Sequence, residues 1–321
     1  MSERLRKRTA QTCQNRLRKR AASYALMENI LFNETGELRS GWRAAIFLFT
    51  FLLLSSAFIF GAMQAVSLSL GEQPAISYLS LIIPFGISSI LAIILGWLYG
   101  RLFEGLPYSA LGFSFRGKWF LHFSAGCVLG TLTFVSAIIV ALMSGGLSLS
   151  INRESAVLAI VTTLLTTIVI FAVGALSEET LFRGYLLQTF TRSNLTPIGI
   201  GLTSTLFAFA HNANPDVSSI SLFNTFLAGV WFAVAYLKTR DLWFPLGIHL
   251  MWNWLQGPVF GINVSGIAEF SPDPILRTTD AGPSWLTGGS YGIEGGVACT
   301  FALILSMALI YVLPKSAPPA G

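Results

Sequence analysis

Long apolar runs dominate the chain, and short polar connections separate them. A helix needs about 20 apolar residues to cross a bilayer, and eight runs reach or approach that length. Their approximate limits are 43–70, 76–100, 119–143, 156–190, 197–212, 217–237, 242–262 and 295–313. The fourth run is too long for a simple span, because its apolar part ends near Leu176 and a polar helical stretch follows without a helix breaker. The pattern predicts an all-α, polytopic membrane helix bundle with about eight transmembrane helices.

The composition favours the same class of protein. Of the 321 residues, 53% are hydrophobic and 11% are charged, whereas a soluble domain carries about 25% charged residues. Eight of the twenty Lys and Arg residues lie in the first twenty positions, and the remaining chain carries 12 basic and 14 acidic residues. We therefore predict no nucleic-acid binding. Cys13, Cys127 and Cys299 are far apart and form no CxxC pair, so we expect neither a disulfide framework nor a thiolate zinc site.

The charges of the connections predict the orientation of the bundle. Basic residues precede the first run and occupy alternate connections, while the opposite connections are mainly acidic. The positive-inside rule then places both termini in the cytoplasm, which eight crossings satisfy. We expect a basic tail at 1–41, a membrane domain at 42–314 and a short cytoplasmic tail at 315–321. The basic tail is a solvated topology signal or is attracted to anionic lipid head groups. The long outer connection at about 263–294 looks irregular and receives no predicted function.

Ionisable side chains within membrane spans are costly and usually functional. Five stand out here, namely Glu178, Glu179, Arg183, His211 and His249. Glu179 and Arg183 are four residues apart, so they can pair on one helix face. Glu178 points about 100° away and has no local partner. Such an unpaired carboxylate suits general acid–base chemistry. The alternative is that both glutamates mark a helix end at the membrane surface, where charge costs little.

Two histidines extend this polar set. His249 and Asn253 are four apart and share a helix face, so both can direct hydrogen bonds toward one point. A lone histidine in an apolar helix is usually a structural hydrogen-bonding group, but two of them beside a carboxylate weaken that interpretation. Glu178 and His211 each lie 14 residues from a short turn at 193–196, or roughly 21 Å along their helices. We therefore expect all four side chains in one layer inside the bundle, reached from the cytoplasmic side.

The spacing of these residues resembles the CPBP family, which contains the type II CAAX prenyl endopeptidases and related bacterial abortive-infection and bacteriocin-processing proteins. The family pattern is EExxxR, FxxxH and HxxxN on successive membrane helices. Here the motifs begin at Glu178, Phe207 and His249, and the supporting context at Asn224, Gly229 and Tyr236 is similar. The resemblance covers about residues 156–260. Each motif alone is weak, whereas three in order at these spacings are a specific signal.

The resemblance implies that the chain is an intramembrane endopeptidase. It also implies a role for each residue in the mechanism. Glu178 would be the general base that activates water, and His211 would help to bind that water. His249 and Asn253 would stabilise the oxyanion, a contribution of about 2.7–4 kcal/mol for donors of this type. Arg183 with Glu179 would hold the helix, with Phe207 in support. No cofactor is implied.

Other interpretations remain open. Zinc held by Glu178, His211 and His249 is an alternative, although no HExxH motif exists and Asn253 would be a poor ligand. Site-2, rhomboid and GxGD protease patterns are absent or incomplete. A non-catalytic adaptor or bacteriocin-immunity protein of the same fold, and a proton-relay transporter, are the non-peptidase alternatives.

The expected partners are the lipid bilayer and a membrane-associated peptide or protein substrate, which the resemblance leaves open to prenylation. The resemblance further implies an integral protein of the bacterial cytoplasmic membrane. The sequence predicts neither the cleavage site nor the oligomeric state.

Overall fold

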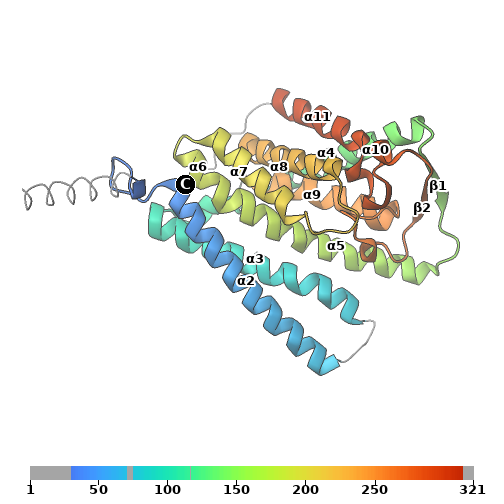
Figure 1. The fold of residues 1–321 in the computed structure, drawn as a ribbon, viewed down its shortest axis with the longest axis horizontal. Helices are drawn as coiled ribbons and strands as arrows, with labels where there is room; N and C mark the ends of the chain where they lie inside the picture. The colour runs from blue at the N-terminus through green and yellow to red at the C-terminus, as the bar shows by residue number, and fades with distance from the viewer. Residues whose placement is uncertain (1–29, 71–74, 116, 314–321) are drawn as a thin grey trace, which may run out of the picture.

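The computed structural model describes residues 30–70, 75–115 and 117–313 (Figure 1). The first 29 residues of the basic tail, with Cys13, and the carboxyl-terminal tail from residue 314 lie outside the described residues. The predictions made for these segments therefore stay predictions. Within the described part of the tail, Phe32 forms an isolated β-bridge with Leu38 before the first long helix begins.

Helices form most of the described chain. In order they are α2 (Ser40–Leu70), α3 (Ala75–Glu104), α4 (Trp119–Met143), α5 (Val157–Glu179), α6 (Leu187–Arg192), α7 (Thr196–Ala210), α8 (Ser219–Thr239), α9 (Trp243–Trp254) and α11 (Val297–Val312). Two π-helical turns, η2 (Thr180–Leu186) and η3 (Leu255–Val259), continue α5 into α6 and extend α9. Shorter elements are the 3-10 turns η1 (Tyr108–Leu111), η4 (Ala268–Phe270), η5 (Gly289–Tyr291) and η6 (Ile293–Gly295), and the helix α10 (Ser284–Thr287).

The structure confirms an all-α polytopic membrane bundle. Among the described residues, five helices are long and apolar enough to cross a membrane. They are Ser40–Ser69, Tyr78–Glu104, Trp119–Met143, Val157–Arg192 and Ser219–Thr239. The other three predicted runs coincide with the shorter helices α7, α9 and α11. The protein is an integral membrane protein.

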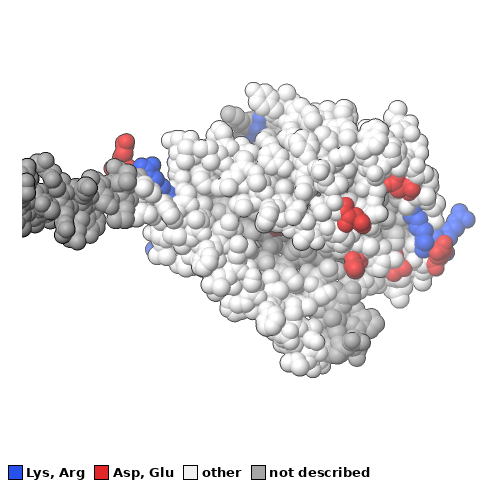
Figure 2. Space-filling model, viewed as in Figure 1, with Lys and Arg blue, Asp and Glu red and all other residues white. Residues whose placement is uncertain are grey.

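The surface of the bundle fits an apolar solvent. Large apolar side chains such as Phe49, Phe60 and Leu68 on α2 are exposed, as are Val157 and Leu158 at the start of α5. Figure 2 shows charged side chains gathered toward the two ends of the visible face, with a broad uncharged band between them. Lipid-facing helices need such a band, because a charged side chain at bilayer depth is costly.

Helices α4 and α9 approach each other closely through glycines. A Cβ atom added at Gly126 would lie 2.2 Å from the carbonyl oxygen of Phe244, and one at Gly130 would lie 2.4 Å from that of Ile248. Gly247 on α9 meets the backbone of α4 in the same way. Gly126 and Gly130 form a GxxxG pair, which allows membrane helices to pack backbone against backbone. This contact positions α9, the helix that carries His249.

The outer connection is more ordered than the sequence predicted. Strand β2 (Leu276–Asp280) pairs antiparallel with β1 (Leu147–Ile151), with Leu147 opposite Asp280. The prediction of an irregular segment at 263–294 is wrong for β2 and for the short helical turns that follow it. This segment covers one end of the bundle beside α11 (Figure 1).

A single added methyl group tests the α4–α9 contact. We expect Gly130→Ala to lower stability by about 1–3 kcal/mol, because overpacking forces the two backbones apart. Gly61→Ala on α2 is the matched control, since nothing lies within 4 Å of the added Cβ there. Thermal melting in detergent micelles measures both variants. Equal melting temperatures for the two variants would show that the close contact does not limit stability.

Candidate active site

Adjacent glutamates lie at the point where α5 changes its helical geometry. Glu178 and Glu179 are the last two residues of α5, and the π-helical turn η2 begins at Thr180. The Thr180 hydroxyl donates to the carbonyl oxygen of Leu176 at 2.6 Å. π-Helical turns inside α-helices occur frequently at functional sites. The two carboxylates therefore leave a continuous helix in different directions, as their spacing predicted.

Glu179 is the centre of a buried ionic group. Its Oε1 lies 3.1 Å from Nη1 of Arg183 and 3.0 Å from Nδ1 of His249. The side chains of Glu179 and Arg183 have no solvent exposure. The pairing of Glu179 with Arg183 agrees with the sequence prediction, but the bond to His249 was missed. A helical spacing rule relates only residues on one helix, so it could not predict a bond between residues 70 positions apart.

Aromatic rings enclose the guanidinium of Arg183. Its carbon Cζ lies 4.8 Å from the ring centroid of Phe207 and 5.1 Å from that of Phe232. Nη2 donates to the carbonyl oxygen of Gly229 at 2.9 Å. Cation–π contacts gain strength when both partners are desolvated. The phenylalanine of the FxxxH motif and the glycine of the supporting context thus hold Arg183 in place.

His249 lies between the two carboxylates. Its ring stacks on Phe232 with centroids 4.6 Å apart, and its Nε2 lies 3.7 Å from Oε2 of Glu178. A carboxylate ionised by its pairing with Arg183 can only accept hydrogen bonds, so Nδ1 of His249 is the nitrogen that donates to Glu179. This bond fixes the ring and turns Nε2 toward Glu178.

His211 occupies the end of a helix and not its interior. It caps α7, whose last residue is Ala210, so the predicted position within an apolar helix is corrected to its carboxyl end. Its Nδ1 lies 2.8 Å from the carbonyl oxygen of Phe207. Since a carbonyl only accepts, Nδ1 carries the proton, which leaves Nε2 of the neutral ring as an acceptor.

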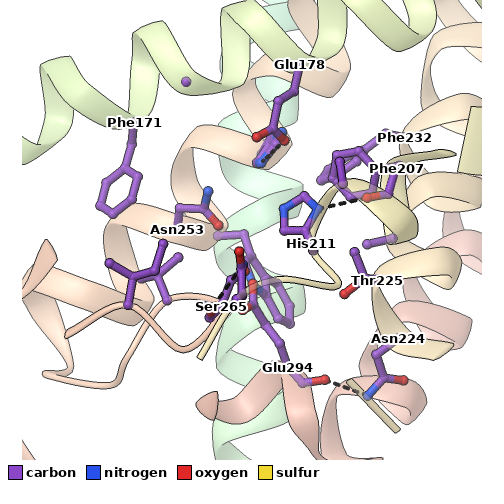
Figure 3. Close-up of a pocket in the computed structure, with 18 of the residues that line it drawn as sticks. Phe171, Glu178, Phe207, His211, Asn224, Thr225, Phe232, Asn253, Ser265 and Glu294 are labelled. Carbon is purple, nitrogen blue, oxygen red and sulfur yellow. Dashed lines mark hydrogen bonds and ion pairs between the residues drawn. The ribbon is translucent and has the colours of Figure 1, made fainter. Parts of the chain in front are cut away.

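The four predicted catalytic residues line one cavity of about 260 Å³. They come from α5 (Glu178), the end of α7 (His211) and α9 (His249 and Asn253). Figure 3 shows the side chains of Glu178, His211 and Asn253 turned toward the same space. The Glu178 side chain is 22% exposed, and its Oε2 has no hydrogen-bond partner among the described residues. Glu178 is therefore the glutamate that is exposed to the cavity, whereas the Glu179 side chain is fully buried.

The outer connection supplies the opposite wall of the cavity, which sequence reasoning missed. Glu294 accepts hydrogen bonds from Nε1 of Trp252 at 3.1 Å and from the backbone nitrogen of Ser265 at 2.7 Å. Asn224 donates to the carbonyl oxygen of Glu294 at 2.8 Å. Burial and the nearby Glu294 carboxylate raise the pKa of Tyr291 to about 12. The available signal was the position of Glu294, an acidic residue just before the last apolar run.

The depth prediction holds in part. Glu178 and His211, which lie on the two arms of the hairpin formed by α5–α6 and α7, line the same cavity. The cavity lining, however, comes from the helix ends remote from that turn and from 264–270 of the outer connection. No described residue of the turn at 193–195 lines this cavity. Access from the side of the turn is therefore not supported by the lining.

The zinc alternative requires Glu178, His211 and His249 to converge as ligands. Among the described residues, no group of three or more His, Cys, Asp and Glu side chains is arranged to hold a metal ion. The Nδ1 atoms of both histidines are engaged by Glu179 and by the Phe207 carbonyl, which leaves their Nε2 atoms as the nitrogens that could face a ligand. In the described residues these three side chains do not converge as a preformed zinc site.

Comparison with known proteins identifies a domain in this part of the chain. Residues 160–255 match the family described as type II CAAX prenyl endopeptidase Rce1-like. An uncharacterized 24.3 kDa protein of Escherichia coli is 34% identical over 89 residues. That match spans 27% of this chain and 40% of the E. coli protein. The Rce1-like segment contains all three motifs, so the family resemblance is confirmed over these residues.

The buried ionic group generates a stability prediction. We expect Arg183→Met to destabilise the protein by about 3–5 kcal/mol, because Glu179 would remain buried without its cation. The double variant Glu179→Gln with Arg183→Met removes both charges and should recover part of that loss. Thermal melting of the purified variants in micelles measures the effect. A double variant as unstable as Arg183→Met would contradict the charge argument.

Proposed function

We propose that this chain, through its Rce1-like domain at 160–255, hydrolyses a peptide bond in a membrane-associated peptide or protein. The Rce1-like family indicates a CAAX-type intramembrane protease as the kind of function. One observation carries the detailed proposal: Glu178, whose side chain is partly exposed, lines the same cavity as His211, whose Nδ1 is occupied. A base and an acceptor that share a cavity can hold one water molecule between them.

The first step in this proposal is the activation of water. Nε2 of His211 accepts a hydrogen bond from the water, and the Glu178 carboxylate takes its proton as the oxygen attacks the carbonyl carbon. Glu178 is suited to this role because Glu179, and not Glu178, neutralises Arg183. The partial burial of Glu178 limits competition from bulk water, which strengthens electrostatic interactions in the cavity.

The second step is the stabilisation of the oxyanion that forms on the carbonyl oxygen. The side-chain amide of Asn253 donates to this oxygen, and Nε2 of His249 donates when the ring carries both protons. The bond from Nδ1 of His249 to Glu179 orients the ring for this task and favours its doubly protonated form. Donors fixed before the reaction are effective because they need little reorganisation in the transition state.

The last step breaks the carbon–nitrogen bond. Glu178, now protonated, donates its proton to the leaving nitrogen, and the intermediate collapses to a carboxylic acid and an amine. One water molecule is consumed. Its oxygen and one hydrogen enter the new carboxyl group, and its other proton goes to the amine. Glu178 is ionised again once its proton has passed to the leaving nitrogen, and the product acid then loses its own proton to solvent.

The walls of the cavity indicate an apolar substrate segment. Phe85, Phe171, Ile267 and Phe270 line the cavity on the side of α3, α5 and the outer connection. These rings fit the side chains of a membrane-associated peptide, because apolar pockets with a few polar groups bind apolar ligands in a fixed orientation. A prenylated peptide is one member of this class.

Replacing the base tests the proposal directly. We expect Glu178→Gln to lower the cleavage rate of a farnesylated peptide, or of a cleaved member of a peptide library, by at least about 100-fold. His211→Ala should give a similar loss, while the melting temperature of both variants stays close to that of the wild type. The assay measures cleavage by protein reconstituted in liposomes.

Glu269→Gln provides the matched control for the base, because Glu269 is exposed and does not line the cavity. It should cleave at the wild-type rate. A metal chelator should leave the wild-type rate unchanged, and strong inhibition by chelator would favour the zinc alternative. Wild-type cleavage by Glu178→Gln would remove Glu178 from the role of base.

The oxyanion role of Asn253 has its own signature. We expect Asn253→Ala to lower kcat by roughly 100-fold to 1,000-fold, because one oxyanion donor is lost. KM should change little, since the donor acts on charge that develops in the transition state. Steady-state kinetics on the same peptide separate the two constants. A raised KM with an unchanged kcat would instead identify Asn253 as a substrate-binding residue.

A further inference from the structure

A second hollow lies at the opposite end of the bundle from the outer connection. It is a groove of about 1010 Å³ formed by residues 30–39, the start of α2, the end of α3 and the turn between α6 and α7. No residue lines both this groove and the catalytic cavity. The groove therefore needs an explanation that is independent of the peptidase site.

One carboxylate in this groove, that of Glu104, forms ion pairs with two guanidinium groups. Glu104 Oε1 lies 2.8 Å from Nη1 of Arg43, and Glu104 Oε2 lies 2.8 Å from Nη2 of Arg192. Nε of Arg192 also donates to Glu104 at 3.0 Å, so this pair is bidentate. Within the described part of the chain, the three side chains together carry a net charge of +1. The rim adds Arg39 and Glu37, which leave that balance unchanged.

This net positive charge is partly withdrawn from water. Arg43 is 4% exposed, and its Nε is buried without a hydrogen-bond partner among the described residues. The Arg192 side chain is 29% exposed and lies on the open side of the groove. Buried charges are stable when they are paired, so this site favours a second anion. Arginine binds phosphate well because its planar group presents several donors at once.

The groove lies at the level of a membrane interface. The membrane-crossing helices Ser40–Ser69, Tyr78–Glu104 and Val157–Arg192 each begin or end at it. Trp42 lines the groove and is 44% exposed, and tryptophan is enriched at the head-group level of membranes. Basic pockets between membrane helices at this level bind lipid head groups.

We propose that the groove binds the phosphate of an anionic phospholipid head group between Arg43 and Arg192. The phosphate neutralises the net positive charge of the three side chains, and Ser40 and Ser193 supply hydroxyl groups beside it. The acyl chains lie along the exposed apolar face of α2. Bound lipid thereby links α2, α3 and α6.

Thermal melting of the full-length chain in micelles tests the proposal. Short-chain phosphatidylglycerol should raise the melting temperature by a few degrees in a saturable manner. Phosphatidylcholine with the same acyl chains, and inorganic phosphate at the same concentration, should have little effect. Arg192→Gln should weaken the apparent affinity for phosphatidylglycerol about tenfold, because charge-assisted hydrogen bonds to the phosphate are lost.

Arg101→Gln is the matched control. Arg101 lies in the last turn of α3 at the same membrane face, is exposed and does not line the groove. Arg101→Gln should retain the wild-type response. Because both variants keep the basic tail, any lipid binding by the tail contributes equally to the two. Arg192→Lys keeps the charge and should bind with intermediate affinity, and its melting temperature without lipid shows whether replacement of Arg192 harms folding. Equal responses to both lipids, a full response to inorganic phosphate, or equal losses in Arg101→Gln and Arg192→Gln would each overturn the proposal.

Discussion

The buried carboxylate of Glu179 is the interaction on which the arrangement of the site depends. It accepts hydrogen bonds from Arg183 on the same continuous helix and from His249 on α9. Because neither the carboxylate nor the guanidinium has access to water, the loss of one partner leaves a charge with nothing to compensate it. The relative positions of α5 and α9 are therefore coupled to the ionisation of three side chains. Arg183 extends this coupling to α8 through the carbonyl oxygen of Gly229.

The adjacent residues Glu178 and Glu179 have different roles, and a single carboxylate could not fill both at once. Glu179 is fully buried and holds the ionic group, whereas Glu178 lines the cavity and is partly exposed. The difference follows from the rotation of about 100° between successive residues of a helix. The glycines of α4 then allow α9 to approach closely enough for His249 to lie between the two carboxylates. Packing and chemistry are thus joined in one short region of the fold.

Much of the site could be predicted because it depends on local periodicity. The pairing of Glu179 with Arg183 and the depth of Glu178 and His211 follow from the rise and turn of a helix. The bond between His249 and Glu179 could not be predicted in this way, since it depends on the rotation of α9 against α5. The contribution of Ser265 and Glu294 was hidden for a similar reason, because an irregular connection has no periodicity to extrapolate.

Isotope labelling of a single turnover tests the central claim that Glu178 activates water and does not attack the substrate itself. The purified protein would cleave a membrane-associated peptide in water enriched in ¹⁸O, and mass spectrometry would locate the label. If Glu178 activates water, one ¹⁸O atom enters the new carboxyl group of the peptide and none enters Glu178. Label in the Glu178 carboxylate after the first turnover would contradict it, because a covalent acyl intermediate would then have formed on that residue.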